Sequence, residues 1–425
     1  MRQILVLATI FMVISCSTTE QKFATNPQDY NNYLTTEVPN TTSKYFELWN
    51  SKITSDSTQL LSFGSVASEY TRYYQNTGDI KFLKNAEKAL TKAVEIAAIN
   101  KSGYYRALAR NYIAQHRFKD ALKMAISARQ LGSGLKESQS LLFDVHMELG
   151  NYKTANKYLD SIKNMSDFGY LIRVAKWNDH LGHLDTTISF MEKAIKKAES
   201  AKNRSLMIWT YSNIADYYGH AGRIEDSYKY YIKTLELDPG NAYVKKGIAW
   251  IVYSFEKNGK EALRILNKVN EHHISPEYYV LKAEIAQFMN DDYAVAHNLD
   301  RYYKMVQNES YGQMYNAYNI EFFIEQTKTY KKALDLAQQE VDNRATPETF
   351  SMLAYAHLKN GNKEKALKIV QEQVTGQTFE PAVLLRVSEI YEAFGMVDQV
   401  AVLKEELAGA IYELGPLSKD RIEAL

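Results

Sequence analysis

Cysteine and proline are almost absent from this chain of 425 residues, which contains one cysteine, Cys16, and seven prolines. A single cysteine excludes internal disulfide bonds, and it excludes cysteine-based metal sites in the body of the protein. The scarcity of proline, together with 32 tyrosines, argues against a disordered chain. It favours helices whose aromatic rings pack against neighbouring helices.

An excess of charge of either sign is also lacking. Fifty-one Lys and Arg residues face 50 Asp and Glu residues, for a net charge of +1. This balance gives no indication of binding to nucleic acid or to an anionic membrane surface. Motifs of catalysis are missing as well: there is no phosphate-binding glycine loop, His-Glu-x-x-His, Gly-x-Ser-x-Gly or cysteine nucleophile. We therefore expect neither an enzyme nor a bound cofactor.

Residues 1–15 have the form of a cleaved export signal. A positively charged start precedes an apolar run from Ile4 to Ile14, which is too short to span a bilayer, and Ser15 stands directly before Cys16. The end of this run resembles the bacterial lipobox, in which the cysteine becomes the lipid-modified mature N-terminus. The alternative is an ordinary signal peptide with an incidental cysteine.

The lipobox resemblance implies that Cys16 carries two or more acyl chains, which are enough for stable membrane anchoring. Ser17 follows the cysteine where inner-membrane retention usually uses Asp, so the outer membrane is favoured and its face is left open. Residues 16–44 are rich in Thr, Asn and Gln and lack a helical period, which predicts a flexible tether.

Residues 208–241 are the clearest of a series of repeats. Their small and aromatic residues stand where a helix–turn–helix unit needs a small contact, an aromatic wedge, a turn, a second wedge and a stop. These positions are held by Ala215, Tyr218, Gly222, Tyr231 and Pro239. This order resembles the tetratricopeptide repeat (TPR). The resemblance implies an all-α fold, a right-handed α-solenoid of antiparallel helix pairs (a TPR superhelix), which serves as an interaction scaffold.

The same spacing recurs along the chain. A small residue of one helix precedes a small residue of the next by twelve positions, as in Ala109 and Ala121 or Ala354 and Ala366. Ala175 begins another such pair, and Tyr112 supplies an aromatic wedge beside Ala109. Small residues at these positions let two helices approach closely. We expect about ten units within residues 45–412, followed by a C-terminal cap over residues 413–425.

The TPR resemblance also implies a concave groove, lined by fixed positions of the first helix in each unit. Carried onto this sequence, those positions predict a groove for a protein or peptide partner. Its residues are Arg106, Arg110, Lys176, Trp209, Asp216, His220, Tyr243, Lys246, Trp250, Tyr253 and Tyr355. Aromatic and Arg residues dominate binding hot spots. The alternative for Trp209 and Trp250 is that they are wedges between helices.

Four histidines raise the alternative that the protein binds a metal ion. His146, His180, His183 and His220 stand near helix ends in adjacent units, and two of them have metal-compatible spacing. The simpler interpretation is that they are solvent-facing or locally bonded, so we predict no metal site.

Two functions remain. The first is a non-enzymatic, lipid-anchored TPR scaffold that binds a protein or extended peptide in its groove, for envelope assembly, secretion or transport. The alternative is a glycan- or nutrient-binding surface lipoprotein whose Trp and Tyr residues stack on sugars. The absence of a long non-repeat insertion favours the first. The Asn-, Lys- and Tyr-rich composition resembles that of envelope proteins from Bacteroidetes-type bacteria.

Overall fold

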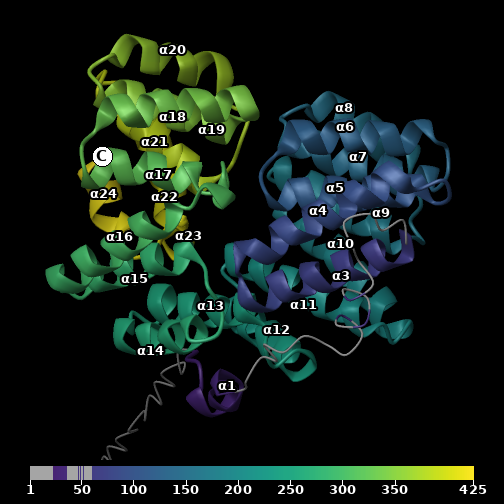
Figure 1. Cartoon of the computed structure of the whole chain (residues 1–425). Coiled ribbons are helices and arrows are strands. Elements are labelled where there is room, and N and C mark those ends of the chain that lie inside the picture. The colour runs from purple at the N-terminus through teal and green to yellow at the C-terminus, as the bar shows by residue number, and fades with distance from the viewer. Residues whose placement is uncertain (1–22, 36–45, 47, 49–50, 52–59) are drawn as a thin grey trace, which may run out of the picture.

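The structure is a computed structural model of the chain. It describes residues 23–35, 46, 48, 51 and 60–425 (Figure 1). These described residues form helices and no strand, so the predicted all-α solenoid is confirmed. The predicted signal of residues 1–15 and Cys16 lie outside the described residues.

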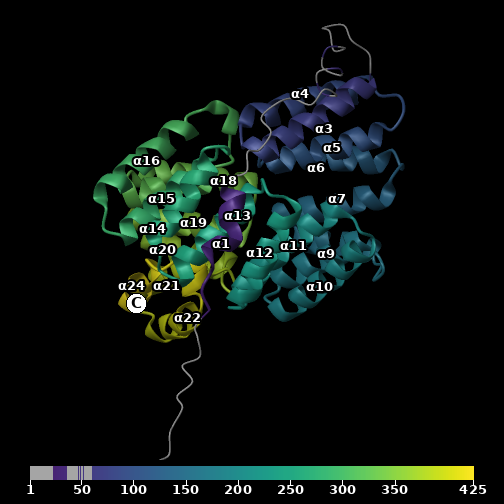
Figure 2. The ribbon, with the colours of Figure 1, turned by 90° about the horizontal axis from the view of Figure 1, so that it is seen from below.

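Ten pairs of helices follow one another along residues 60–409 (Figures 1 and 2). The first helices of the pairs are α3 (Leu60–Thr77), α5 (Lys101–Ala114), α7 (Leu135–Glu148), α9 (Phe168–His180), α11 (Arg204–His220), α13 (Ala242–Trp250), α15 (Pro276–Phe288), α17 (Asn316–Glu321), α19 (Pro347–Lys359) and α21 (Pro381–Glu392). The second helices are α4 (Ile80–Ile96), α6 (Phe118–Gln130), α8 (Tyr152–Ser161), α10 (Leu184–Ser200), α12 (Ile224–Leu237), α14 (Gly259–Asn270), α16 (Asp292–Val306), α18 (Tyr330–Asn343), α20 (Lys363–Gln373) and α22 (Val397–Gly409).

Two first helices are extended by π-helical turns, α13 by η1 (Ile251–Phe255) and α17 by η3 (Phe322–Gln326). A short 3-10 turn, η2 (Glu309–Tyr311), precedes α17. No helix among the described residues combines the length and the apolar character that a membrane span requires.

Local signals explain why one unit, α11 with α12, folds as it does. Asn203 caps α11, its side chain accepting a hydrogen bond from the backbone N–H of Leu206 at 3.1 Å. Gly222 adopts a positive φ of 70° in the turn to α12. Small residues then set the distance between paired helices: the six alanines expected at these contacts are fully buried. They are Ala109, Ala121, Ala175, Ala215, Ala354 and Ala366.

The predicted tether contains a docked helix, α1 (Pro27–Leu34), so the prediction of a flexible segment was wrong for these residues. Tyr30 and Leu34 are buried against α12 and α14, and the Tyr30 hydroxyl donates to Glu261 at 2.8 Å. Two apolar side chains one turn apart are enough to dock a helix. They are too few to produce a recognisable helical period in the sequence.

The array curves until loops of later units meet turns of earlier units. The backbone N–H of Ile274 donates to the carbonyl of Thr77 at 2.6 Å. Farther along, the side-chain amide of Asn343 donates to the carbonyl of His116 at 3.1 Å. These contacts join residues some two hundred positions apart, and they hold the two halves of the array together.

Glycine is required at one of these meeting points for two reasons. Gly150 has a φ of 73°, a conformation that residues with a side chain rarely adopt. A Cβ atom there would also lie 2.2 Å from the carbonyl oxygen of Ala345. The turn therefore fits against the later loop only without a side chain.

The chain ends in α23 (Ile411–Leu414) and α24 (Ser418–Ala424), which we call the C-terminal segment (residues 411–424). It does not continue the array outward. Instead α23 contacts α11, η1 and α21, so the segment returns to the side of the array lined by the first helices (Figure 1). We call that side the inner surface.

Candidate functional site

Helices α11, α13, α15 and α17 surround a cavity of about 300 Å³ on the inner surface, which we call the aromatic cavity. Tyrosine, tryptophan and carboxylate side chains make up most of its wall. It is lined by Asp216, Tyr231, Tyr243, Lys246, Gly247, Trp250, Glu277, Val280, Leu281, Glu284 and Tyr318. Four residues of the predicted groove, Asp216, Tyr243, Lys246 and Trp250, are thus brought together.

Asp216 is held by two tyrosines of the cavity. The hydroxyls of Tyr231 and Tyr243 each donate to one of its carboxylate oxygens at 2.5 Å. Burial raises the pKa of the Asp216 carboxyl, and these two hydrogen bonds oppose that rise. Tyr243 remains 50% exposed, so its ring offers an accessible aromatic face at the mouth of the cavity.

Lys246 is the one cation in the cavity wall, and it already has a partner. Its Nζ lies 3.2 Å from Oε1 of Glu277. It also lies 5.6 Å from the centroid of the Tyr243 ring. The cavity wall therefore holds three carboxylates against one ammonium group.

Glu284, like Asp216, is a carboxylate of this wall without an ion-pair partner among the described residues. Tyr253 donates its hydroxyl to Oε1 of Glu284 at 3.0 Å. Burial raises the pKa of the Glu284 carboxyl to about 7; the Tyr253 hydrogen bond opposes the rise and the nearby Glu321 adds to it. Within the described part of the chain, no Lys, Arg or His forms an ion pair with Glu284.

The C-terminal segment lies beside the aromatic cavity. The carbonyl oxygen of Tyr412 accepts hydrogen bonds from Nε1 of Trp250 at 3.1 Å and from the hydroxyl of Ser254 at 2.6 Å. A Cβ atom on Gly415 would lie 2.6 Å from Oε1 of Glu284, so the main chain there closes one side of that carboxylate.

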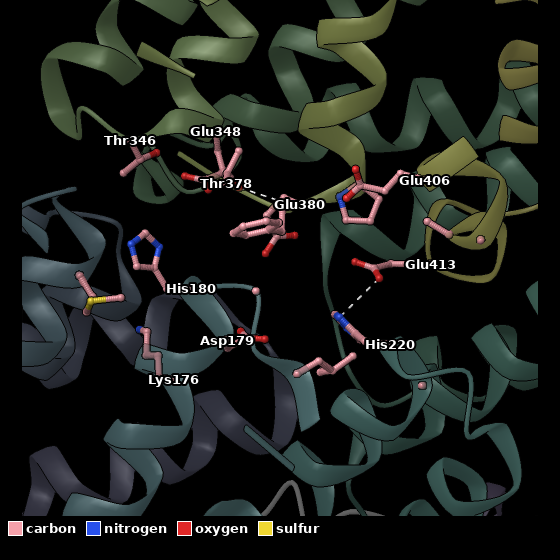
Figure 3. A pocket seen from close by; sticks show the side chains of 18 of the residues that line it. Lys176, Asp179, His180, His220, Thr346, Glu348, Thr378, Glu380, Glu406 and Glu413 are labelled. Atoms are coloured by element: carbon pink, nitrogen blue, oxygen red, sulfur yellow. Dashed lines mark hydrogen bonds and ion pairs between the residues drawn. The ribbon is translucent and has the colours of Figure 1, made fainter. Parts of the chain in front are cut away.

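A second and larger cavity, of about 500 Å³, lies between the two halves of the array (Figure 3). Earlier units contribute Lys176, Asp179, His180 and His220, and later parts of the chain face them with mainly acidic side chains (Figure 3). These are Glu348, Glu380, Glu406 and Glu413. We call it the acidic cavity.

Carboxylates repel one another across the acidic cavity. Burial, followed by the charges of Glu413, Asp179 and Glu348, raises the pKa of Glu380 to about 7. Across the space, Nδ1 of His220 lies 3.5 Å from a carboxylate oxygen of Glu413 (Figure 3). Among the described residues, no group of three or more His, Cys, Asp or Glu side chains is arranged to hold a metal ion.

Comparison with known proteins identifies the unit at the centre of the inner surface. Residues 210–241 match the tetratricopeptide repeat family. The match covers most of α11 and the whole of α12, and it includes Asp216 and Tyr231 of the aromatic cavity. No curated protein sequence matches the chain.

Several solved structures resemble the chain. A tetratricopeptide repeat protein from Parabacteroides merdae is 16% identical and covers 57% of this chain and 94% of its own, with a TM-score of 0.39. Human IFIT1, solved as a dimer with m7Gppp-AAAA, is 14% identical over 73% of this chain and 70% of its own, with a TM-score of 0.48. Yeast Tom70 is 13% identical over 82% of this chain and 91% of its own, with a TM-score of 0.34.

Two of the predicted groove residues do not face a partner. Tyr253 is fully buried and Tyr355 is 4% exposed. Their hydroxyls are used by acidic side chains of other inner helices: Tyr253 donates to Glu284, and Tyr355 donates to Glu389 at 2.6 Å. Their assignment to the groove was wrong because both side chains are buried within the packed helices.

Arg106 is half-buried and forms hydrogen bonds within the fold, outside both cavities. Its guanidinium donates to the carbonyl of Ser133 at 3.0 Å and to the hydroxyl of Ser138 at 3.2 Å. These bonds tie α5 to the start of α7. Arg110 is exposed and lies outside both cavities.

The remaining predicted groove residues fall elsewhere on the inner surface. Lys176 and His220 line the acidic cavity, where Lys176 pairs with Glu148 at 2.7 Å. Trp209 is 41% exposed and its ring meets that of Phe168 edge-on at 6.3 Å. Trp209 thus lies outside the aromatic cavity, although its helix contributes Asp216 to it.

His146, His180 and His183, which the sequence offered as metal candidates, are not gathered at one site. His146 stacks on Tyr158 with ring centroids 5.6 Å apart, and His180 stacks on Tyr152 at 3.9 Å. His183 precedes α10 as its N-terminal flanking residue. The rings of His146 and His180 thus lie against different tyrosines.

Among the polar and aromatic residues of the aromatic cavity, sequence reasoning missed three, Glu277, Glu284 and Tyr318. A signal for two of them existed. The TPR positions that gave Tyr243 and Trp250 in one first helix give Glu277 and Glu284 in the next. Extending the register by one unit would have found them.

Proposed function

We propose that the protein is a non-enzymatic scaffold, anchored through lipid at Cys16, which holds a segment of a partner protein on its inner surface. The observation that carries the proposal is the hydrogen bonding of Tyr412. Trp250 and Ser254 on the inner surface bind a main-chain carbonyl of a segment that belongs to no helix pair. Contacts of this kind hold a peptide without demanding a particular side chain.

The aromatic cavity gives such a segment a place to insert a side chain. Tyr243 and Trp250 are of the residue types that dominate binding hot spots, and they lie at a concave site. At about 300 Å³ the cavity is at the lower limit of small-molecule sites. It therefore suits one anchoring side chain better than a whole ligand.

Matched variants on two surfaces test the proposal. The inner variant replaces Tyr243, Lys246 and Glu277 with Ala, and so removes an exposed ring and an ion pair. The outer variant replaces Tyr293, Asp300 and Lys304 of α16 with Ala, which removes the same kinds of group. Each chain is cross-linked in native envelopes and purified.

We expect the inner variant to lose the proteins that the wild-type chain captures, and the outer variant to keep them. Melting temperatures of both variants must remain near that of the wild type. Equal capture by both variants would refute the inner surface as the binding site. Captured oligosaccharide in place of protein would refute a protein partner.

The anchor has a separate test. Two or more acyl chains hold a protein at a membrane far longer than one. Cys16→Ala should release the chain into the soluble fraction of the envelope. Continued membrane association of this variant would exclude lipidation at Cys16, whatever the partner proves to be.

A further inference from the structure

We infer that the aromatic cavity binds an arginine side chain of the partner segment, with its guanidinium group at Glu284. This inference rests on the proposed function, since it names the chemistry of the segment that the inner surface would hold. Three observations support it: the negative charge of the cavity wall, the aromatic side chains in that wall, and a second tyrosine–glutamate pair on the inner surface that binds an arginine.

Charge is the first argument. Asp216, Glu277 and Glu284 face the cavity with only Lys246 to balance them, and Lys246 is paired with Glu277. A cationic group would relieve this imbalance, and it would supply the partner that Glu284 lacks among the described residues. An anionic or neutral ligand would leave three carboxylates in a partly desolvated space.

The aromatic rings are the second argument. Trp250, Tyr243 and Tyr318 surround the space, and aromatic faces attract cations, guanidinium groups most often. Val280 and Leu281 provide apolar contact for an aliphatic side-chain stem. A side chain with a three-carbon stem and a planar cation matches these walls.

The chain itself supplies the third argument. Farther along the inner surface, Tyr355 donates to Glu389 at 2.6 Å, as Tyr253 donates to Glu284 at 3.0 Å. The guanidinium of Arg421 occupies the first of these sites: its Nε donates to Glu389 at 3.0 Å and another of its nitrogens approaches the Tyr355 hydroxyl at 3.4 Å. The tyrosine–glutamate pair beside the aromatic cavity has no such occupant within the described residues.

The two sites differ in where an arginine could come from. Arg421 belongs to the C-terminal segment, which passes the Glu284 site at Gly415. Glycine brings no side chain, so the segment leaves the aromatic cavity open while it fills the neighbouring site. We therefore assign the second arginine to the partner segment.

Fluorine NMR of the full-length protein labelled with 5-fluorotryptophan tests the inference, because the chain has only four tryptophans. Trp250→Phe assigns the resonance of Trp250. N-acetyl-arginine amide is titrated at pH 8, and N-acetyl-citrulline amide serves as the neutral probe of the same shape. Glu284→Gln removes the charge, and Glu364→Gln on the exposed surface of α20 is the matched control.

We expect the arginine probe to shift the Trp250 resonance saturably, with no saturable shift from the citrulline probe. Glu284→Gln should weaken binding about tenfold, as the loss of a charge-assisted hydrogen bond does, and Glu364→Gln should not change it. Equal shifts with both probes, or unchanged affinity in Glu284→Gln, would overturn the inference. Neither result depends on a partner, so the scaffold proposal is judged separately by the capture experiment.

Discussion

The indole Nε1 of Trp250 donates a hydrogen bond to the carbonyl oxygen of Tyr412, 3.1 Å away and 162 positions later in the chain. This bond places the end of the chain on the inner surface of the central units. The surface therefore holds one peptide segment already, and the aromatic cavity lies immediately beside it.

Trp250→Phe should loosen the C-terminal segment without unfolding the array. Loss of one hydrogen bond costs about 1 kcal/mol, and Ser254 still donates to the same carbonyl. Hydrogen–deuterium exchange should become faster in residues 411–424, with little change in the melting temperature. Trp209→Phe, at a ring that does not touch the segment, is the control. Unchanged exchange in the first variant would mean that the bond does not hold the segment.

Gly150→Ala should destabilise the protein more than Gly222→Ala. Both glycines have similar φ angles, 73° and 70°, so both variants carry the strain of a left-handed alanine, about 1 kcal/mol. Only at Gly150 does the new Cβ meet another part of the chain, the carbonyl oxygen of Ala345 at 2.2 Å. We expect an additional loss of about 1–3 kcal/mol in the free energy of unfolding, measured in urea. Equal losses would show that the two halves do not meet at this turn.

Lys245→Met should stabilise the protein at pH 7. Lys245 is 5% exposed, and burial lowers its pKa from 10.5 to about 8. Lys245 therefore binds its proton more tightly in the unfolded chain than in the folded protein. As a result, the charged lysine lowers the free energy of unfolding below pH 8, and this loss diminishes between pH 8 and 10.5.

The expected gain at pH 7 is about 1–3 kcal/mol in the free energy of unfolding, and it should shrink at pH 10. Lys260→Met, at an exposed position, should change the stability by less than about 0.5 kcal/mol at either pH. A loss of stability in Lys245→Met at pH 7 would contradict the burial of this charge.

Glu284→Gln should alter how stability depends on pH. The folded-state pKa of Glu284 is about 7 and its ordinary value is 4.5. The folded protein therefore holds the proton more tightly, and this carboxyl makes wild-type stability fall as pH rises from 4.5 to 7. The charged and titratable groups around it are Tyr253 on η1, Tyr318 and Glu321 on α17, Glu277 on α15 and Lys246 on α13.

Glutamine keeps the acceptor for Tyr253 but cannot titrate. The variant should therefore gain stability relative to the wild type on going from pH 5 to pH 8, as measured by urea unfolding at the two values. A constant difference between the two proteins across this range would mean that the Glu284 carboxyl is not desolvated.

The repeat architecture could be predicted because it depends on local, periodic features. Alanines twelve positions apart and glycines in turns recur in the sequence, and the alanines are buried in the structure. Helix α1 could not be predicted in this way, since Tyr30 and Leu34 form no period.

The residues of the candidate site could be only partly predicted from the sequence. Tyr243, Lys246 and Trp250 share one face of α13, and Asp216 lies on the neighbouring α11, so a correct register brought the four together. The roles of Tyr412 and Gly415 depend on how far the array curves. That curvature accumulates from small rotations between units, and no single residue encodes it.

The most direct test of the binding surface is photo-cross-linking in living cells, with a photoreactive phenylalanine analogue at position 243 or 293. Tyr243 stands at the mouth of the aromatic cavity, whereas Tyr293 is 83% exposed on α16. We predict an adduct from position 243 that maps to one arginine-containing segment of one protein, and none of that adduct from position 293. The same adducts from both positions, or none from position 243, would contradict this prediction.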